Sequence, residues 1–178
     1  MTIFLFAGHG GTDSGAVGVN GRREADEAIR LRDRVKAYLP PNSGVSIDNN
    51  ADPLREVLRK AQTGSGSVVL DIHFNAASSI ASGCEVLIGD DAKQNDIDLA
   101  TDILTALVKN LGIKNRGIKK ESETPRRRLG VMRESGAVCL AEVCFISNKN
   151  DMAAYDKAFD SLARDIATVL VKHDAKAT

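Results

Sequence analysis

Two histidines of this chain stand in sequence contexts that suit metal chemistry. His9 follows a short apolar segment and lies among glycines at positions 8, 10 and 11, which leave its imidazole free. His73 lies near the end of segment 68–74, the strongest strand pattern in the chain. A hydrolytic zinc site takes three nitrogen or oxygen ligands and keeps one position open for water, so two histidines require a carboxylate. Because 64 positions separate the histidines, spacing alone leaves a structural role open for each.

Three acidic residues compete for the third ligand position at the start of one predicted helix. Glu24, Asp26 and Glu27 all fall in the first turn of segment 24–39. Acids in a first turn also interact favourably with the helix dipole, which is a structural reason for their presence. The residue spacing therefore does not choose among the three.

Glu142 is an acid inside the apolar segment 137–145. Burying a carboxylate without a partner is costly, so a bound cation or substrate would explain its presence. A carboxylate beside the open metal position would take a proton from water and return it to a leaving amine, and Glu142 suits this role. The alternative is a structural glutamate paired with Arg133. The third histidine, His173, lies in the polar tail and is interpreted as incidental.

Apolar periodicity and turn residues predict strands that alternate with helices. The expected strands are 3–7, 45–47, 68–74, 84–88, 129–132 and 137–145, and the expected helices are 24–39, 53–62, 94–111 and 152–172. Residues 112–128 are expected to be irregular, and Asp52 to cap the second helix. We predict a single α/β domain over residues 1–178, with a central, twisted, mostly parallel or mixed β-sheet flanked by α-helices on both faces.

The overall composition argues against several classes of function. Basic and acidic residues are equal at 24 each and the pI is near 6.8, so no nucleic-acid partner is expected. The basic run Arg126-Arg127-Arg128 is interpreted as a solvated loop or as a groove wall facing an anionic substrate. No apolar stretch reaches the roughly 20 residues that span a bilayer, so we expect no membrane insertion. The apolar start is too short for an export signal, which predicts accumulation in the cytoplasm.

Four separated motifs resemble, in the same order, those of the zinc-dependent N-acetylmuramoyl-L-alanine amidases found among bacterial wall-remodelling enzymes and phage endolysins. The motifs are segments 8–16, 21–24, 73–76 and 140–148. The resemblance implies that His9, Glu24 and His73 hold one Zn²⁺ per chain, with Glu24 preferred to its acidic neighbours, and that Glu142 is the catalytic carboxylate. Asp71 stands where the family usually has serine, so it either orients His73 or lies beside it unused.

The resemblance further implies hydrolysis of the amide between N-acetylmuramic acid and L-alanine in peptidoglycan. Asn75 is a candidate substrate contact, and loops 12–20, 75–82 and 112–128 are expected to wall the groove. We expect a monomer without a separate wall-binding domain. The expected lack of a wall-binding domain, of an insertion after His73 resembling an autoinhibitory helix, and of an export signal favours a phage endolysin, which reaches the wall after holin release, over a host wall-remodelling amidase. Further alternatives are a zinc peptidase or deacylase acting on another amide, and a catalytically silent wall-binding module.

Overall fold

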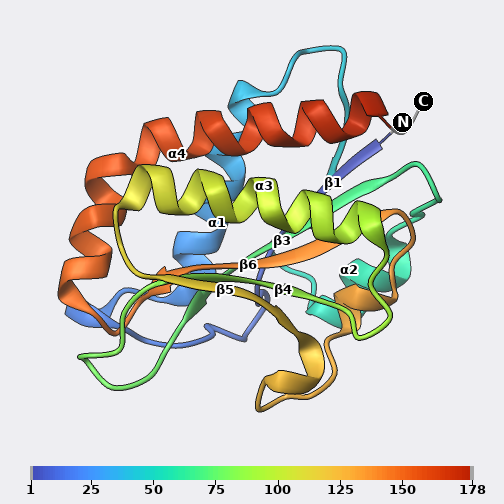
Figure 1. Ribbon diagram of the computed structural model, residues 1–178. Helices are drawn as coiled ribbons and strands as arrows, with labels where there is room; N and C mark the ends of the chain where they lie inside the picture. The colour runs from blue at the N-terminus through green and yellow to red at the C-terminus, as the bar shows by residue number, and fades with distance from the viewer. Residues whose placement is uncertain (1, 177–178) are drawn as a thin grey trace.

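The computed structural model describes residues 2–176 and contains a six-stranded sheet with helices packed on it (Figure 1). In spatial order the strands are β2 (Gly44–Ile47), β1 (Thr2–Ala7), β3 (Val68–Asn75), β6 (Ala137–Phe145), β4 (Cys84–Ile88) and β5 (Asn115–Lys120). Neighbouring strands run parallel except β4 and β6, which are antiparallel. The predicted α/β domain with a mostly parallel, mixed sheet is confirmed.

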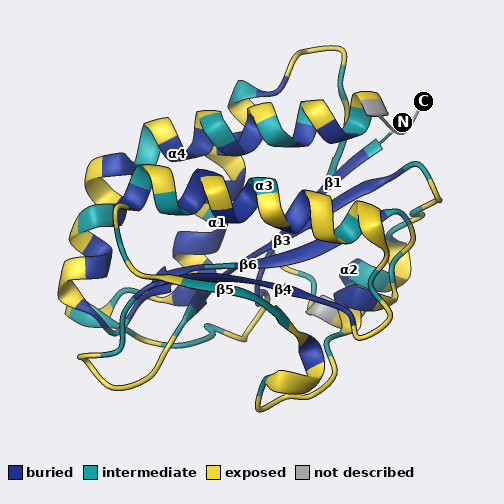
Figure 2. Ribbon diagram, viewed as in Figure 1, coloured by how far each residue is buried: buried dark blue, intermediate teal, exposed yellow. Residues whose placement is uncertain are grey.

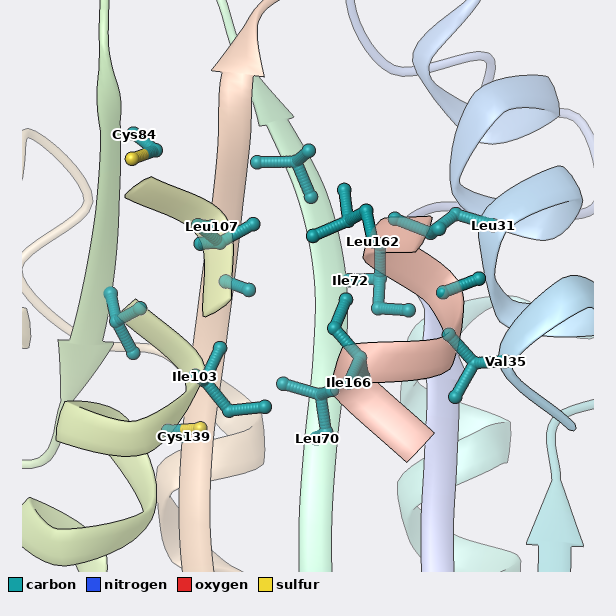
Figure 3. Close-up of a cluster of buried hydrophobic side chains, with 14 of the residues drawn as sticks. Leu31, Val35, Leu70, Ile72, Cys84, Ile103, Leu107, Cys139, Leu162 and Ile166 are labelled. Atoms are coloured by element: carbon teal, nitrogen blue, oxygen red, sulfur yellow. The ribbon is translucent and has the colours of Figure 1, made fainter. Parts of the chain in front are cut away.

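Three long helices cover one face of the sheet, with their buried sides turned toward it (Figure 2). They are α1 (Glu24–Tyr38), α3 (Gln94–Leu111) and α4 (Lys149–Lys176). On α3, Leu99, Ile103 and Leu107 recur every four residues, so they share one face of the helix and are fully buried. Figure 3 shows Ile103 near the strand residues Cys139 and Leu70, with Leu107 further along the same face of α3. Burial of each large aliphatic side chain contributes about 1.5–3 kcal/mol, and this cluster is the main core.

The opposite face of the sheet has a smaller apolar cover. It consists of the short helix α2 (Leu54–Lys60) and the 3-10 helix Gly130–Arg133, whose apolar side chains pack on residues of β1, β3, β4 and β6. The rest of this face is open toward the carboxyl ends of the parallel strands, where α/β sheets bind their ligands. No helix in residues 2–176 is long and apolar enough to cross a membrane.

Three details predicted from the sequence are wrong. Residues 129–132, expected as a strand, lie mostly in the 3-10 helix, because a short apolar run does not distinguish strand from helix. The stretch 112–128, expected to be irregular, contains β5, an edge strand that is only partly buried. Asp52 does not cap α2; its carboxylate accepts a hydrogen bond from Lys60 Nζ at 2.6 Å.

A buried ion pair fixes the loop after β2 to α1 and to the end of β1. Asp48 Oδ1 accepts hydrogen bonds from Arg32 Nη1 at 2.7 Å and from Ala7 N at 3.0 Å. Only 3% of the Asp48 side chain and 2% of the Arg32 side chain are exposed. Removing one partner leaves the other charge buried without compensation, so Asp48→Ala is expected to reduce the free energy of unfolding by about 3–5 kcal/mol, measured by urea denaturation.

Asp33 provides the matched control for this pair. It binds the same guanidinium, accepting from Arg32 Nη2 at 2.8 Å, but its side chain is 54% exposed. Water can replace an exposed carboxylate, so Asp33→Ala is expected to cost less than about 1 kcal/mol. Equal losses of unfolding free energy in the two variants would show that the buried Asp48–Arg32 pair stabilises the fold no more than the exposed Asp33–Arg32 pair.

Candidate metal centre

His9 is held just after β1 in a backbone conformation that residues other than glycine rarely adopt. Its φ is 68°, in the left-handed region. The preceding residue, Gly8, donates its N–H to Ile72 O at 2.7 Å, which ties the loop to β3. Asp13 Oδ2 lies 2.8 Å from His9 Nδ1, so the other ring nitrogen, Nε2, faces Glu24 Oε2 at 3.1 Å. Strained residues that their surroundings hold in place cluster at functional sites.

Glu24 is the first residue of α1, and its carboxylate lies between the two histidines. Its oxygens accept hydrogen bonds from Ala16 N at 3.0 Å and Phe74 N at 3.1 Å, and Oε1 is 3.0 Å from His73 Nδ1. Burial alone would raise the pKa of Glu24, but hydrogen bonds with His73 and His9 outweigh it, so the pKa is held well below its usual value. The carboxylate is therefore ionised and fixed at the centre of the cluster.

The two other acids of the first turn of α1 point elsewhere. Glu27 accepts a hydrogen bond from Arg22 Nε at 2.8 Å, and the exposed Asp26 lies 3.8 Å from Arg23 Nε. The ambiguity that residue spacing left among the three acids is therefore resolved by geometry, because Glu24 alone of them lies beside the histidines.

His73 and Asp71 point from β3 to the same side of the sheet. Asp71 is fully buried, and neither of its carboxylate oxygens accepts a hydrogen bond from any residue in the range 2–176. Its Oδ2 lies 3.4 Å from His73 Nε2, the ring nitrogen opposite the one that faces Glu24. Burial lowers the pKa of His73, but Asp71 and Glu24 outweigh it and hold this pKa well above its usual value. Asp71 thus lies where it can orient the His73 ring.

The three residues His9, Glu24 and His73 fit a divalent metal ion. One nitrogen from each histidine and one Glu24 oxygen all lie within 4.8 Å of one another. Two imidazoles and a carboxylate are a donor set of hydrolytic zinc sites, in which bonds of about 2.0–2.1 Å place tetrahedral ligand atoms roughly 3.3 Å apart. The separations of 3.0 and 3.1 Å between histidine nitrogens and Glu24 oxygens are close to that spacing. The cluster is therefore consistent with a metal site.

Glu142 lies beside this cluster, because it pairs in register with His73 across β3 and β6. Its Oε2 is buried and has no hydrogen-bond partner in the described part of the chain. Arg133, the structural partner considered from the sequence, instead pairs with Glu121. Burial raises the pKa of Glu142 to about 7, and the opposing charge of His73 does not compensate. A carboxyl group with this pKa can exchange protons near neutral pH.

These side chains line one groove with a volume of about 700 Å³. The three loops predicted to wall it all contribute residues to its lining. Asn75 also lines the groove and donates from Nδ2 to Glu85 Oε1 at 2.9 Å. His173, interpreted as incidental, lies on α4, where Nε2 is 2.6 Å from Asp102 Oδ2.

Sequence reasoning missed a further buried carboxylate in the groove, Glu85 on β4. Its Oε2 accepts hydrogen bonds from Lys119 Nζ at 2.6 Å and Arg116 Nε at 2.8 Å, and all three residues line the groove. The signal was the one that identified Glu142, an acid within an apolar strand segment. The two cations were not predicted as site residues because they lie on β5, a strand that the sequence pattern did not predict.

A family described as N-acetylmuramoyl-L-alanine amidase matches residues 3–172. The chain belongs to this family. The match spans the two histidines and the two glutamates discussed above, and it confirms the predicted family of N-acetylmuramoyl-L-alanine amidases.

The curated relatives of this amidase have different descriptions. The protein YqiI of Bacillus subtilis is 34% identical, over 84% of this chain and 72% of that protein. The "Probable autolysin PH" of Staphylococcus aureus is 31% identical over 93% of this chain, and the endolysin of Bacillus phage SPP1 is 28% identical over 93%. The aligned regions cover only 37% of the autolysin and 61% of the endolysin. Among solved structures, the N-acetylmuramoyl-L-alanine amidase AmiC2 of Nostoc punctiforme has a TM-score of 0.77 at 25% identity, covering 97% and 96% of the two chains.

Gly8 of this amidase has no room for a side chain, because the His73 ring occupies the space. A Cβ atom at position 8 would lie 2.5 Å from His73 Nδ1. Gly8→Ala is therefore expected to displace the imidazole and to weaken zinc binding by about tenfold or more, measured by competition with a chelator. The control is Gly64→Ala, whose new Cβ would meet nothing within 4 Å. Unchanged zinc affinity in Gly8→Ala would mean that His73 does not need this position to bind metal.

Proposed function

We propose that this chain hydrolyses the amide between N-acetylmuramic acid and L-alanine in peptidoglycan, using one zinc ion held by His9, Glu24 and His73. One observation carries the proposal: three side chains that fit a metal ion lie in the same groove as Glu142, whose Oε2 is buried and has no hydrogen-bond partner within residues 2–176. Membership of the amidase family supports the choice of bond.

Zinc, Glu142 and two aspartates have separate roles in the proposed reaction. Zinc, when bound, supplies polarisation of the scissile carbonyl and acidifies water. Glu142 accepts a proton from water on its unpaired Oε2 and returns it to the leaving amine of L-alanine, which its pKa of about 7 permits. Asp13 and Asp71 each face the ring nitrogen of a histidine that points away from Glu24, and so orient the two imidazoles.

The products of peptidoglycan digestion test this proposal. Purified walls treated with the zinc-loaded protein should release peptides with a free L-alanine amino group, and a chelator should stop the release. New amino groups between stem residues, with the muramoyl link intact, would instead identify a zinc peptidase. A protein that contains no zinc after purification and releases nothing would be a wall-binding module.

We propose further that this cleavage serves lysis of the wall, as in an endolysin. The similarity to the endolysin of phage SPP1 supports this role, whereas the similarity to an autolysin supports turnover of the cell's own wall. Expression of the chain in bacteria separates the two. An endolysin that accumulates in the cytoplasm should leave growth unaffected until the membrane is permeabilised, and the culture should then clear within minutes. Clearing without permeabilisation would contradict cytoplasmic accumulation.

A further inference from the structure

A row of charged side chains crosses the floor of the groove from strand to strand. His73 on β3 is in register with Glu142 on β6, and Glu142 is in register with Glu85 on β4. On β5, Lys119 pairs with Leu87, which lines the same groove. The row therefore begins at the metal ligands, passes the catalytic carboxylate and ends at a lysine on the edge strand.

The far end of this row is a fixed cluster around Glu85. The carboxylate is buried and holds Lys119 and Arg116, whose side chains are 30% and 28% exposed. The guanidinium of Arg116 also stacks on Phe145, with 5.0 Å between Cζ and the ring centroid. Burial raises the pKa of Glu85, but the two cations outweigh it, so the pKa is lowered and the carboxylate is ionised.

The cluster of Glu85, Lys119 and Arg116 carries a net positive charge. One carboxylate, Glu85, compensates two cations, and Arg116 binds it only through Nε, so its two Nη atoms have no hydrogen-bond partner within residues 2–176. Arg126, from the basic run noted in the sequence, also lines the groove, but its charge acts on Asp13, beside His9. The acid Glu123 also lines the groove, but its carboxylate accepts a hydrogen bond from the backbone N–H of Lys120 at 2.7 Å and forms no ion pair with Lys119 or Arg116. The cluster therefore has donors and charge left for an anion.

We propose that Lys119 and Arg116, held in place by Glu85, bind a carboxylate of the stem peptide as the scissile amide lies beside Glu142. This rests on the proposed function. The sugar side of the scissile bond is uncharged, whereas the second stem residue is glutamate linked through its side chain, which leaves an α-carboxylate one residue beyond L-alanine. Strands β6 and β5 are two spacings apart, about 10 Å, and long lysine and arginine side chains shorten that gap. The peptide thus runs across the strands toward β5.

Two synthetic muramoyl tripeptides test the inference on the unmodified protein. Both carry an amidated C-terminus, and they differ in one group, a free α-carboxylate or a carboxamide on the second residue. A charge-assisted hydrogen bond from a cation should make kcat/KM about 10- to 100-fold higher for the carboxylate form, mainly through KM. Lys119→Met and Arg116→Met should each bring the ratio of kcat/KM between the two substrates toward one. Lys120→Met, which changes an exposed lysine outside the groove, should leave this ratio unchanged.

The outcomes separate this inference from the proposed function. Equal kcat/KM for the two tripeptides would overturn the inference and leave the amidase function intact. Failure to release L-alanine amines from either tripeptide and from peptidoglycan would remove both. If only peptidoglycan is cleaved, the comparison is made on walls with a free or an amidated α-carboxylate at the second stem residue, and equal rates on the two would overturn the inference. Zinc content and thermal melting show whether each variant is folded, and the comparison of substrates on the unmodified chain needs no variant.

Discussion

Replacing Glu142 by glutamine is expected to lower the rate of amide hydrolysis by about 10²- to 10⁴-fold, the usual contribution of a general acid–base group. Glutamine keeps the shape of the side chain but cannot accept a proton from water at neutral pH. The three metal-binding residues are untouched, so zinc content should stay the same. The release of free amines from peptidoglycan gives the rate, and elemental analysis of the same sample gives the metal.

The matched control is Glu56→Gln, which makes the same chemical change on α2, outside the groove. It should leave both rate and zinc content unchanged. Near-normal hydrolysis by Glu142→Gln would rule out the proposed role of this carboxylate. Loss of zinc from Glu142→Gln would make Glu142 a metal ligand instead, a role that its unpaired Oε2 also permits.

Replacing Glu24 by alanine is expected to abolish zinc binding and, with it, activity. The Glu24 carboxylate lies within 3.1 Å of a nitrogen of each histidine, so its removal takes away one ligand and the group that aligns the other two. Loss of an outer hydrogen-bonding partner already weakens metal binding by about 10- to 100-fold, and loss of a ligand should exceed that. Chelator competition measures the affinity, and His9→Ala and His73→Ala should behave in the same way.

The neighbouring acids are the controls for Glu24. Asp26→Ala and Glu27→Ala remove carboxylates from the same helical turn, but these point to Arg23 and Arg22. Zinc should stay bound in both variants. Normal zinc affinity in Glu24→Ala, with loss in either neighbour, would assign the third ligand to that neighbour.

The sequence identified the groups of the site better than their arrangement. His9 and Glu142 were recognisable because glycines flank the first and apolar residues surround the second. The choice of Glu24 over Glu27 was different, since helix spacing treats the three acids alike and only the resemblance to a family preferred one. Hydrogen bonds from Ala16 and Phe74, far apart in the chain, fix Glu24, and no local pattern contains them.

The fold, like the site, was predictable only in part from the sequence. Central strands such as β3 were evident because both faces are buried and, apart from Asp71, His73 and Asn75, the segment is apolar. The edge strand β5, residues Asn115–Lys120, contains two lysines, an arginine and a glycine, and it is defined by its pairing with β4 rather than by its own composition. Lys119 and Arg116 became candidates for substrate binding only once that pairing placed them over Glu85.

The unpaired carboxylates of the groove have a consequence for heat resistance. Both oxygens of Asp71 and Oε2 of Glu142 are buried without hydrogen bonds within residues 2–176, and each such group lowers the stability of the folded chain. The large core on the other face of the sheet must offset this penalty. A chain selected only for survival at high temperature would therefore tend to replace these acids with neutral residues, and the most heat-resistant descendants would be inactive. Melting temperature alone is thus a misleading guide for engineering this amidase.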